Sequence, residues 1–104
     1  MIDEYEYKYK LTKLLNNEDY LQFLQDITKC EWFSYPAHEI AKIVANGNYG
    51  SLSPKQRKVY KWYVYRPIEK LRHCRVCGVF IAWKDMYYTL ATDNLCYKCA
   101  KIYF

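Results

Sequence analysis

The chain has 104 residues, a net charge of +5 and 52% hydrophobic residues. This length suits one domain, or a small helical domain with an attached metal-binding module. No run of about 18 apolar residues occurs, which excludes a membrane-spanning helix. The first six residues, Met-Ile-Asp-Glu-Tyr-Glu, lack the pattern of a signal peptide, and the five cysteines, four of them in pairs, suit a reducing compartment. We therefore expect a cytoplasmic protein.

Charge is distributed unevenly along the chain. Residues 1–50 carry five cations and eight acids, whereas residues 51–104 carry eleven cations and three acids. The positive charge of the protein therefore belongs to its second half. Thirteen tyrosines supply much of the apolar content. Because a buried tyrosine needs a partner for its hydroxyl, many of them suit half-buried surfaces and interfaces.

Residues 3–15 fit two patterns. Tyrosines alternate with charged residues, as in a half-buried strand. The same stretch places Glu4 before Lys8 and Glu6 before Lys10, which is the favourable spacing of ion pairs on a helix. Three leucines then continue a helical face. We favour the helix and keep the strand as the alternative.

Two helices are predicted in the rest of the first half. Asn17 fits an N-cap, two acids follow it, and apolar residues then recur at helical spacing, so we expect an amphipathic helix from about 18 to 29. Pro36 fits the first position of a second helix with a narrow apolar stripe. Asn46-Gly47 ends it, with Gly47 as a left-handed cap.

The clearest helix start is Ser53-Pro54-Lys55-Gln56, which fits a capping box with proline at the first helical position. This helix should run to about Tyr65, because Pro67 disfavours a helical conformation at Arg66. The alternative is that it resumes with a kink through Leu71.

Two Cys-x-x-Cys pairs near the C-terminus predict a metal site. Cys74 and Cys77 form the first pair, Cys96 and Cys99 form the second pair, and 18 residues separate the two pairs. That spacing is typical of a four-cysteine zinc site. Zinc takes four thiolates tetrahedrally at about 2.3 Å, and such a closed site leaves no position for a substrate. We therefore expect one structural Zn²⁺, with an iron–sulfur cluster, a redox dithiol or disulfides as alternatives.

The remaining C-terminal elements are short. His73 precedes the first pair, and we interpret it as a neighbour of the site in preference to a substitute ligand. Val79-Phe80-Ile81-Ala82 predicts a short strand, and residues 84–92 fit a strand or a helical turn. Asp93-Asn94 either turns the chain or caps a short helix.

The predicted fold is mainly α with a small β part. Residues 1–66 form a helical part of three or four helices, and residues 67–104 form a four-cysteine zinc-binding module that is treble-clef-like or ribbon-like. The boundary falls within residues 66–73.

The cysteine motif carries a family resemblance. The pattern Cys74-x-x-Cys77-Gly78-x-x-Ile81, followed by Leu95-Cys96-x-x-Cys99, resembles the four-cysteine zinc finger of the DksA/TraR family of bacterial transcription regulators. It covers roughly residues 74–102. The resemblance implies a metal-ligand role for the four cysteines. The family's coiled-coil hairpin with an acidic tip has no counterpart in this chain. The remainder resembles small uncharacterised bacterial and prophage proteins with a Leu-Ser-Pro-Lys-Gln helix before a four-cysteine finger, which implies no activity.

A basic run begins at the third predicted helix. Its candidate nucleic-acid-binding residues are Lys55, Arg57, Lys58, Lys61, Arg66, Lys70 and Arg72, with Glu69 as the single acid among them. Cations beside aromatic side chains neutralise phosphates and stack on bases. With a zinc module, the run predicts binding to nucleic acid or to the transcription machinery. The alternative is a solvated helix face that balances the acidic first half. A helix-turn-helix is disfavoured, because the connection before Ser53 is longer than its usual turn.

The aromatic surplus supports a different function, a protein–protein adaptor or inhibitor related to phage or defence, because tyrosine and tryptophan concentrate at interfaces. Catalysis is not expected. The chain has no His-Glu-x-x-His motif, phosphate loop or nucleophile elbow, so we predict neither an enzyme nor a small-molecule substrate. Cys30 lies beside Trp32 and Phe33 and is interpreted as a packed apolar thiol.

Overall fold

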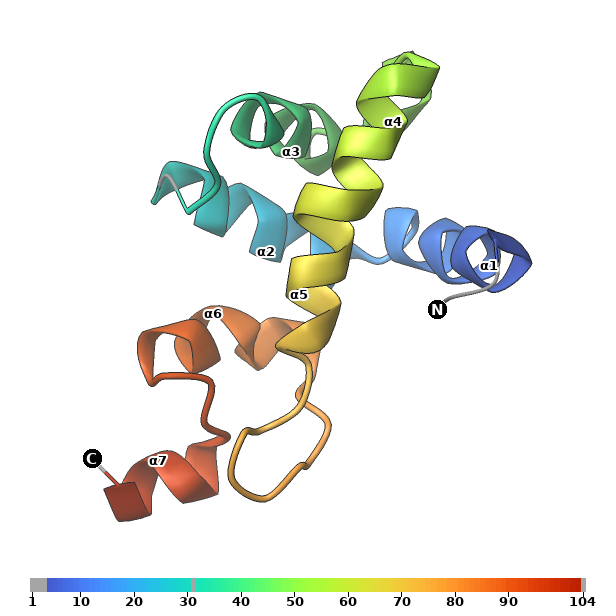
Figure 1. The fold of residues 1–104 in the computed structure, drawn as a ribbon. Helices are drawn as coiled ribbons and strands as arrows, with labels where there is room; N and C mark the ends of the chain where they lie inside the picture. Colours follow the sequence, from blue (N-terminus) through green and yellow to red (C-terminus); the bar gives the residue numbers. More distant parts are fainter. Residues whose placement is uncertain (1–3, 31, 104) are drawn as a thin grey trace.

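In the computed structural model, which describes residues 4–30 and 32–103, helix α1 spans Glu4–Leu15 (Figure 1). The helical prediction for this stretch is confirmed; residue 3 lies outside the described residues. Tyr7, Leu11 and Leu14 are its buried residues. Their spacing of three and four residues puts them on one face of a helix, and Tyr7 packs edge-on against Tyr65 with ring centroids 4.9 Å apart.

Helices α2 (Glu18–Lys29) and α3 (Ala37–Ala45) pack against each other. Asn17 caps α2, because its side-chain oxygen accepts the backbone N–H groups of Asp19 and Tyr20 at 2.9 and 3.3 Å. The predicted start and end of α2 are confirmed. Pro36 lies one residue before the first helical residue of α3, so the prediction that it opens the helix is wrong by one position.

The end of α3 follows the prediction at Gly47. This glycine has φ +80°, in the left-handed region that favours glycine. Its N–H donates to the carbonyl of Val44 at 2.9 Å, and the N–H of Asn48 donates to that of Ile43 at 3.1 Å. These two bonds define a Schellman motif. A short 3₁₀ helix, η1 (Tyr49–Ser51), leads to the next helix.

One long helix crosses the molecule, formed by α4 (Pro54–Tyr60), the π-helical segment η2 (Lys61–Tyr65) and α5 (Arg66–Lys70). Ser53 and Gln56 make both bonds of the predicted capping box. The prediction that the helix stops at Tyr65 is wrong, because Arg66 is helical with φ −65° and ψ −45°. In the wider turn of η2, the N–H of Arg66 donates to the carbonyl of Lys61. Such a turn gives the ring of Pro67 more room against the preceding turn, and Pro67 itself has no N–H to donate.

The last third contains α6 (Trp83–Ala91) and α7 (Tyr97–Tyr103). Residues 84–92 are thus mostly helical, so the helical alternative for this stretch is confirmed and the strand is excluded. The predicted strand at residues 79–82 is wrong: within the described residues, its only β pairing is the isolated bridge between His73 and Phe80. Asp93 and Asn94 both have positive φ, 58° and 60°, and turn the chain. The described fold is mainly α, as predicted, with the four cysteines clustered near its C-terminal end.

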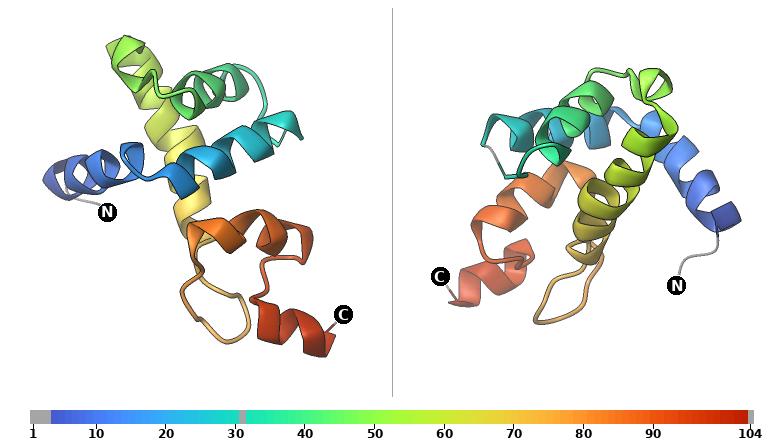
Figure 2. Two further views of the ribbon diagram at one scale, coloured as in Figure 1. Left: turned by 180° about the vertical axis from the view of Figure 1, so that it is seen from behind. Right: turned by 45° about the horizontal axis from the view of Figure 1, so that its top comes forward.

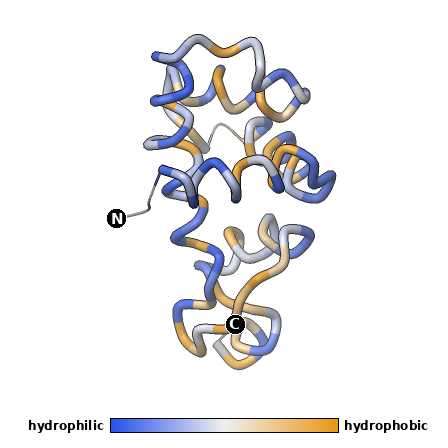
Figure 3. The backbone as a smooth tube through the Cα atoms, turned by 90° about the vertical axis from the view of Figure 1, so that its right-hand side faces the viewer, coloured by the Kyte–Doolittle hydropathy of each residue, from blue (hydrophilic) through white to orange (hydrophobic). Residues whose placement is uncertain are grey.

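The long helix organises the arrangement of the other elements. Figures 1 and 2 show α2 and α3 on one side of it and α1 on the other, with α6 packed against α2 and α7 following it near the loop after α5. Apolar and polar residues interleave along the helices, as Figure 3 shows. Trp83 at the start of α6 packs on Tyr20 and Phe23 of α2, with ring centroids 4.7 and 5.7 Å apart. These contacts join the C-terminal elements to the core. No helix in the described part of the chain is both long and apolar enough to cross a membrane.

Candidate metal centre

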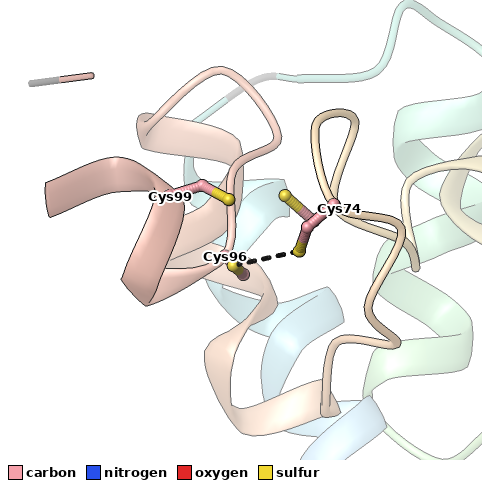
Figure 4. A group of neighbouring side chains, drawn as sticks. Cys74, Cys96 and Cys99 are labelled. Atoms are coloured by element: carbon pink, nitrogen blue, oxygen red, sulfur yellow. Dashed lines mark hydrogen bonds between the residues drawn. The ribbon is translucent and has the colours of Figure 1, made fainter. Parts of the chain in front are cut away.

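Four sulfur atoms converge at the C-terminal end of the molecule. The Sγ atoms of Cys74, Cys77, Cys96 and Cys99 all lie within 4.8 Å of one another, and those of Cys77 and Cys96 are 3.7 Å apart. Figure 4 shows the sulfurs facing one another from the loop after α5 and from the start of α7. Four sulfurs bound tetrahedrally at about 2.3 Å from zinc are about 3.8 Å apart. The donor set and its spacing therefore fit one Zn²⁺.

The first cysteine pair lies on a tight loop. The N–H of Cys74 donates to the carbonyl of Val79, and the N–H of Gly78 donates to the carbonyl of Cys74, both at 2.9 Å. Gly78 has φ +75°, a backbone conformation that residues other than glycine rarely adopt. These bonds bring Cys77 back beside Cys74. His73 is not part of the cluster, since its Nδ1 faces the carbonyl of Gly78 at 3.3 Å.

The two halves of the site are joined by contacts that need no metal. Arg75 donates from its backbone N–H to the carbonyl of Asn94 at 3.0 Å and from Nε to the carbonyl of Asp93 at 2.8 Å. Its Nη2 also pairs with the Asp93 carboxylate at 2.9 Å. In return, the Asn94 side chain donates to the carbonyl of His73 at 3.2 Å. The sequence marks Asp93-Asn94 as a turn, but no local pattern predicts its pairing with Arg75.

The environments of two thiols differ in a way that matters for metal binding. Hydrogen bonds from the backbone N–H groups of Cys77 and Cys96 lower the pKa of the Cys74 thiol to about 5. Burial, together with hydrogen bonds to the neighbouring thiols, raises the pKa of Cys99 to about 12. Zinc binds thiolates, so binding must displace the proton of Cys99, whereas Cys74 is ionised at neutral pH.

Arg72 lies in the interior, between α5 and the metal centre. Its guanidinium stacks between Trp83 and Phe80, 3.6 and 4.2 Å from the ring centroids, and its Nε donates to the carbonyl of Ile81 at 2.9 Å. The side chain is buried, and this burial lowers its pKa. Arg72 therefore does not belong to the basic surface predicted from the sequence; it connects the long helix to the cysteine loop.

The other predicted basic residues lie along the long helix. Lys55, Arg57, Lys58 and Lys70 are exposed, whereas Lys61 and Arg66 are half-buried. Two guanidinium groups stack on aromatic rings: Arg57 on Tyr49 at 5.1 Å and Arg66 on Trp62 at 4.2 Å from the centroid. Lys61 pairs with Glu4 of α1, its Nζ 2.7 Å from the carboxylate.

Two other features lie away from the basic helix. Cys30 is exposed, so its interpretation as a packed thiol is wrong; its Sγ lies 3.0 Å from the Tyr87 hydroxyl. Beside the cysteine cluster there is a mostly apolar hollow of about 510 Å³, lined in part by Phe80, Tyr88 and Tyr97.

Comparison with known proteins finds no matching family, curated protein or solved structure. The assignment of a metal site therefore depends on the geometry of the four cysteines alone. The resemblance of their motif to the DksA/TraR finger stays a prediction.

Proposed function

We propose that this protein is a non-enzymatic, zinc-stabilised nucleic-acid-binding protein. The observation that carries the proposal is the row of cations on one continuous helix. Lys55 and Lys70 mark its ends, about 22 Å apart at the rise of an α-helix. Glu69 is the only acid in residues 54–70. The six cations of this basic face are Lys55, Arg57, Lys58, Lys61, Arg66 and Lys70.

The proposed role of zinc is structural. Four thiolates complete a tetrahedral shell, so the ion would hold the loop after α5 to the start of α7 without activating water. Because Arg72 links that loop to the long helix, the metal centre would help to fix the end of the basic face.

The energy of such binding would come mainly from phosphate contacts. Each contact releases counterions, and the logarithm of affinity falls by about 0.7–0.9 per contact for each tenfold rise in salt. About four contacts predict a loss of affinity of roughly 100-fold between about 50 and 200 mM salt.

The experiment is a fluorescence-polarisation titration of labelled DNA and RNA oligonucleotides with zinc-loaded protein at these two salt concentrations. Changing Lys55 and Lys58 together to Glu should weaken binding by at least tenfold. A matched control changes Lys84 and Lys98 to Glu, which alters net charge equally at exposed sites on α6 and α7. No binding at about 50 mM salt would overturn the proposal, as would an equal loss in both variants.

A second candidate function is a protein–protein adaptor. It is favoured by the apolar hollow beside the cysteine cluster, where Phe80 and Tyr97 are 60% and 62% exposed. Exposed aromatic patches mark protein interfaces. A partner that is retained after nuclease treatment, and lost when Phe80 and Tyr97 are changed to Ser, would favour this function over the first.

A further inference from the structure

A groove of about 500 Å³ runs between α1 and the long helix. The long helix forms one wall, with Arg57 and Lys58 on α4 and Lys61 at the start of η2. Helix α1 contributes Lys8 to the other wall. Four cations thus surround one groove, against a single acid, Glu4. Lys8 is not part of the basic run in the sequence, and only the packing of α1 brings it to this surface.

Aromatic rings line the same groove. They come from three elements, with Tyr7 on α1, Tyr49 on η1 and Trp62 on η2. Trp62 is 50% exposed and carries the Arg66 guanidinium 4.2 Å from its ring centroid. A nucleobase stacks on an exposed indole, and a guanidinium held against the indole adds a cation–π contribution. Because Arg57 is also held over Tyr49, two of the cations near the groove lose less rotamer freedom when they bind a ligand.

Glu4 occupies the place of an anion in this groove. Its carboxylate lies 2.7 Å from the Nζ of Lys61, which also lies 4.7 Å from the centroid of the Tyr7 ring. The hydrogen bond from Lys61 lowers the pKa of Glu4, so this carboxylate is ionised at neutral pH. An incoming phosphate would compete with it for Lys61.

We infer that the nucleic acid is single-stranded and binds in this α1–α4 groove, with phosphates on the four cations of the groove and a base on Trp62. The inference rests on the proposed function. It follows from combining cations with an exposed stacking platform in a groove. In a duplex, neighbouring base pairs cover the faces of each base, so a base reaches Trp62 only after it is unpaired and unstacked. Phosphate contacts alone would make no such distinction.

The first test compares one sequence as a single strand of about 12 nucleotides and as a blunt duplex, each titrated with zinc-loaded protein at about 50 mM salt. The single strand should bind at least tenfold more tightly. Equal affinity, or a preference for the duplex, would overturn the groove inference while the proposed function stands. No binding of either oligonucleotide would overturn both.

Matched variants place the strand in the groove. Trp62→Ala should weaken single-strand binding about tenfold, the typical effect of losing one stacked base. Tyr63→Ala is the control, since Tyr63 is 65% exposed and does not line the groove. Lys8→Glu should weaken binding and reduce the salt slope by about 1. Lys13→Glu makes the same charge change on the same helix, away from the groove. Equal effects within either pair, with all variants folded by circular dichroism, would contradict the inference.

A gain of affinity tests the role of Glu4. Glu4→Gln removes the carboxylate that competes for Lys61 and should tighten single-strand binding by up to about fivefold. Glu6→Gln is the control, because Glu6 pairs with Lys10 on α1 and does not line the groove. Weaker binding by the Glu4 variant would contradict a phosphate site at Lys61.

Discussion

Tyr20 and Tyr60 share a hydrogen bond between their hydroxyl groups in the centre of the core. Both side chains are at most 1% exposed. Burial raises the pKa of both phenols and raises that of Tyr65 to about 12. The tyrosines that composition assigns to interfaces therefore serve two purposes. Tyr20 and Tyr60 fill the core with paired hydroxyls, and others, such as Tyr63, remain exposed.

The buried tyrosines predict loss of stability at high pH. In the unfolded chain, tyrosine ionises near pH 10, whereas the folded chain keeps these protons to higher pH. Their contribution is therefore fully present below about pH 10, and the free energy of unfolding falls above it by up to about 1.4 kcal/mol per pH unit for each such tyrosine. Denaturant unfolding between about pH 8 and 11 measures the slope.

Two variants assign this slope to buried phenols. Tyr60→Phe removes one ionisable group from the core. Above pH 10 the free energy of unfolding should therefore fall less steeply, by up to about 1.4 kcal/mol per pH unit, which is the contribution of one tyrosine. Tyr63→Phe changes an exposed phenol and should leave the slope as it is. Stability that stays constant from about pH 10 to 11 would contradict the argument.

At the scale of elements, the long helix shows how two local rules combine. Its start follows the capping box at Ser53, whose hydroxyl accepts the backbone N–H of Gln56 at 3.1 Å. Its course past Pro67 does not follow the local rule, because Arg66 keeps helical backbone angles although it precedes a proline. The side chains that hold the turn before Pro67 in place are Val64 and Tyr65, which are at most 1% exposed. Burial of this kind outweighs the weak preference of a residue before proline.

Removing the cap tests the first of these rules. Ser53→Ala should lower the free energy of unfolding by about 1 kcal/mol, because the N–H of Gln56 loses its acceptor. Ser51→Ala is the control, since the Ser51 hydroxyl donates to the carbonyl of Asn48, just before η1, and caps no part of the long helix. Urea denaturation measures both variants. A cap variant as stable as the control would show that tertiary packing alone sets the start of the helix.

At the scale of the whole molecule, the C-terminal elements depend on two kinds of support. Trp83 and Met86 of α6 are buried in the common core, where Trp83 contacts α2. Helix α7 and the loop after α5 have less such packing and converge on the four sulfurs. Small zinc modules gain about 10–16 kcal/mol of apparent metal-binding energy coupled to folding. We therefore expect metal to order the cysteine loop and α7.

Metal removal tests this dependence. The purified protein should contain about one zinc per chain. Cys77→Ser, or a strong chelator, should remove it and unfold the cysteine loop and α7, seen as fast hydrogen exchange there, while α6 stays protected by its contacts with α2. Cys30→Ser is the matched control, because Cys30 lies outside the cluster. Full zinc content in the Cys77 variant, or unchanged folding without metal, would contradict a structural zinc site.

The sequence by itself determined the features that depend on residues a few positions apart. The cap at Asn17, the capping box at Ser53, the left-handed Gly47 and the spacing within each cysteine pair belong to this class. Each is a bond or a backbone conformation within one turn, so the residue types alone indicate it. The four-cysteine cluster was predictable for the same reason, since two short pairs of one ligand type leave few alternatives.

Only the tertiary structure decided which distant residues meet. It continues the helix through Arg66 and stacks Arg72 between two rings instead of exposing it. It also brings Lys8 to the groove beside Lys58. These outcomes depend on burial against elements far away in the chain, and that energy is not encoded in local spacing or charge. The basic run in the sequence thus indicates a surface, and the fold selects the residues that form its groove.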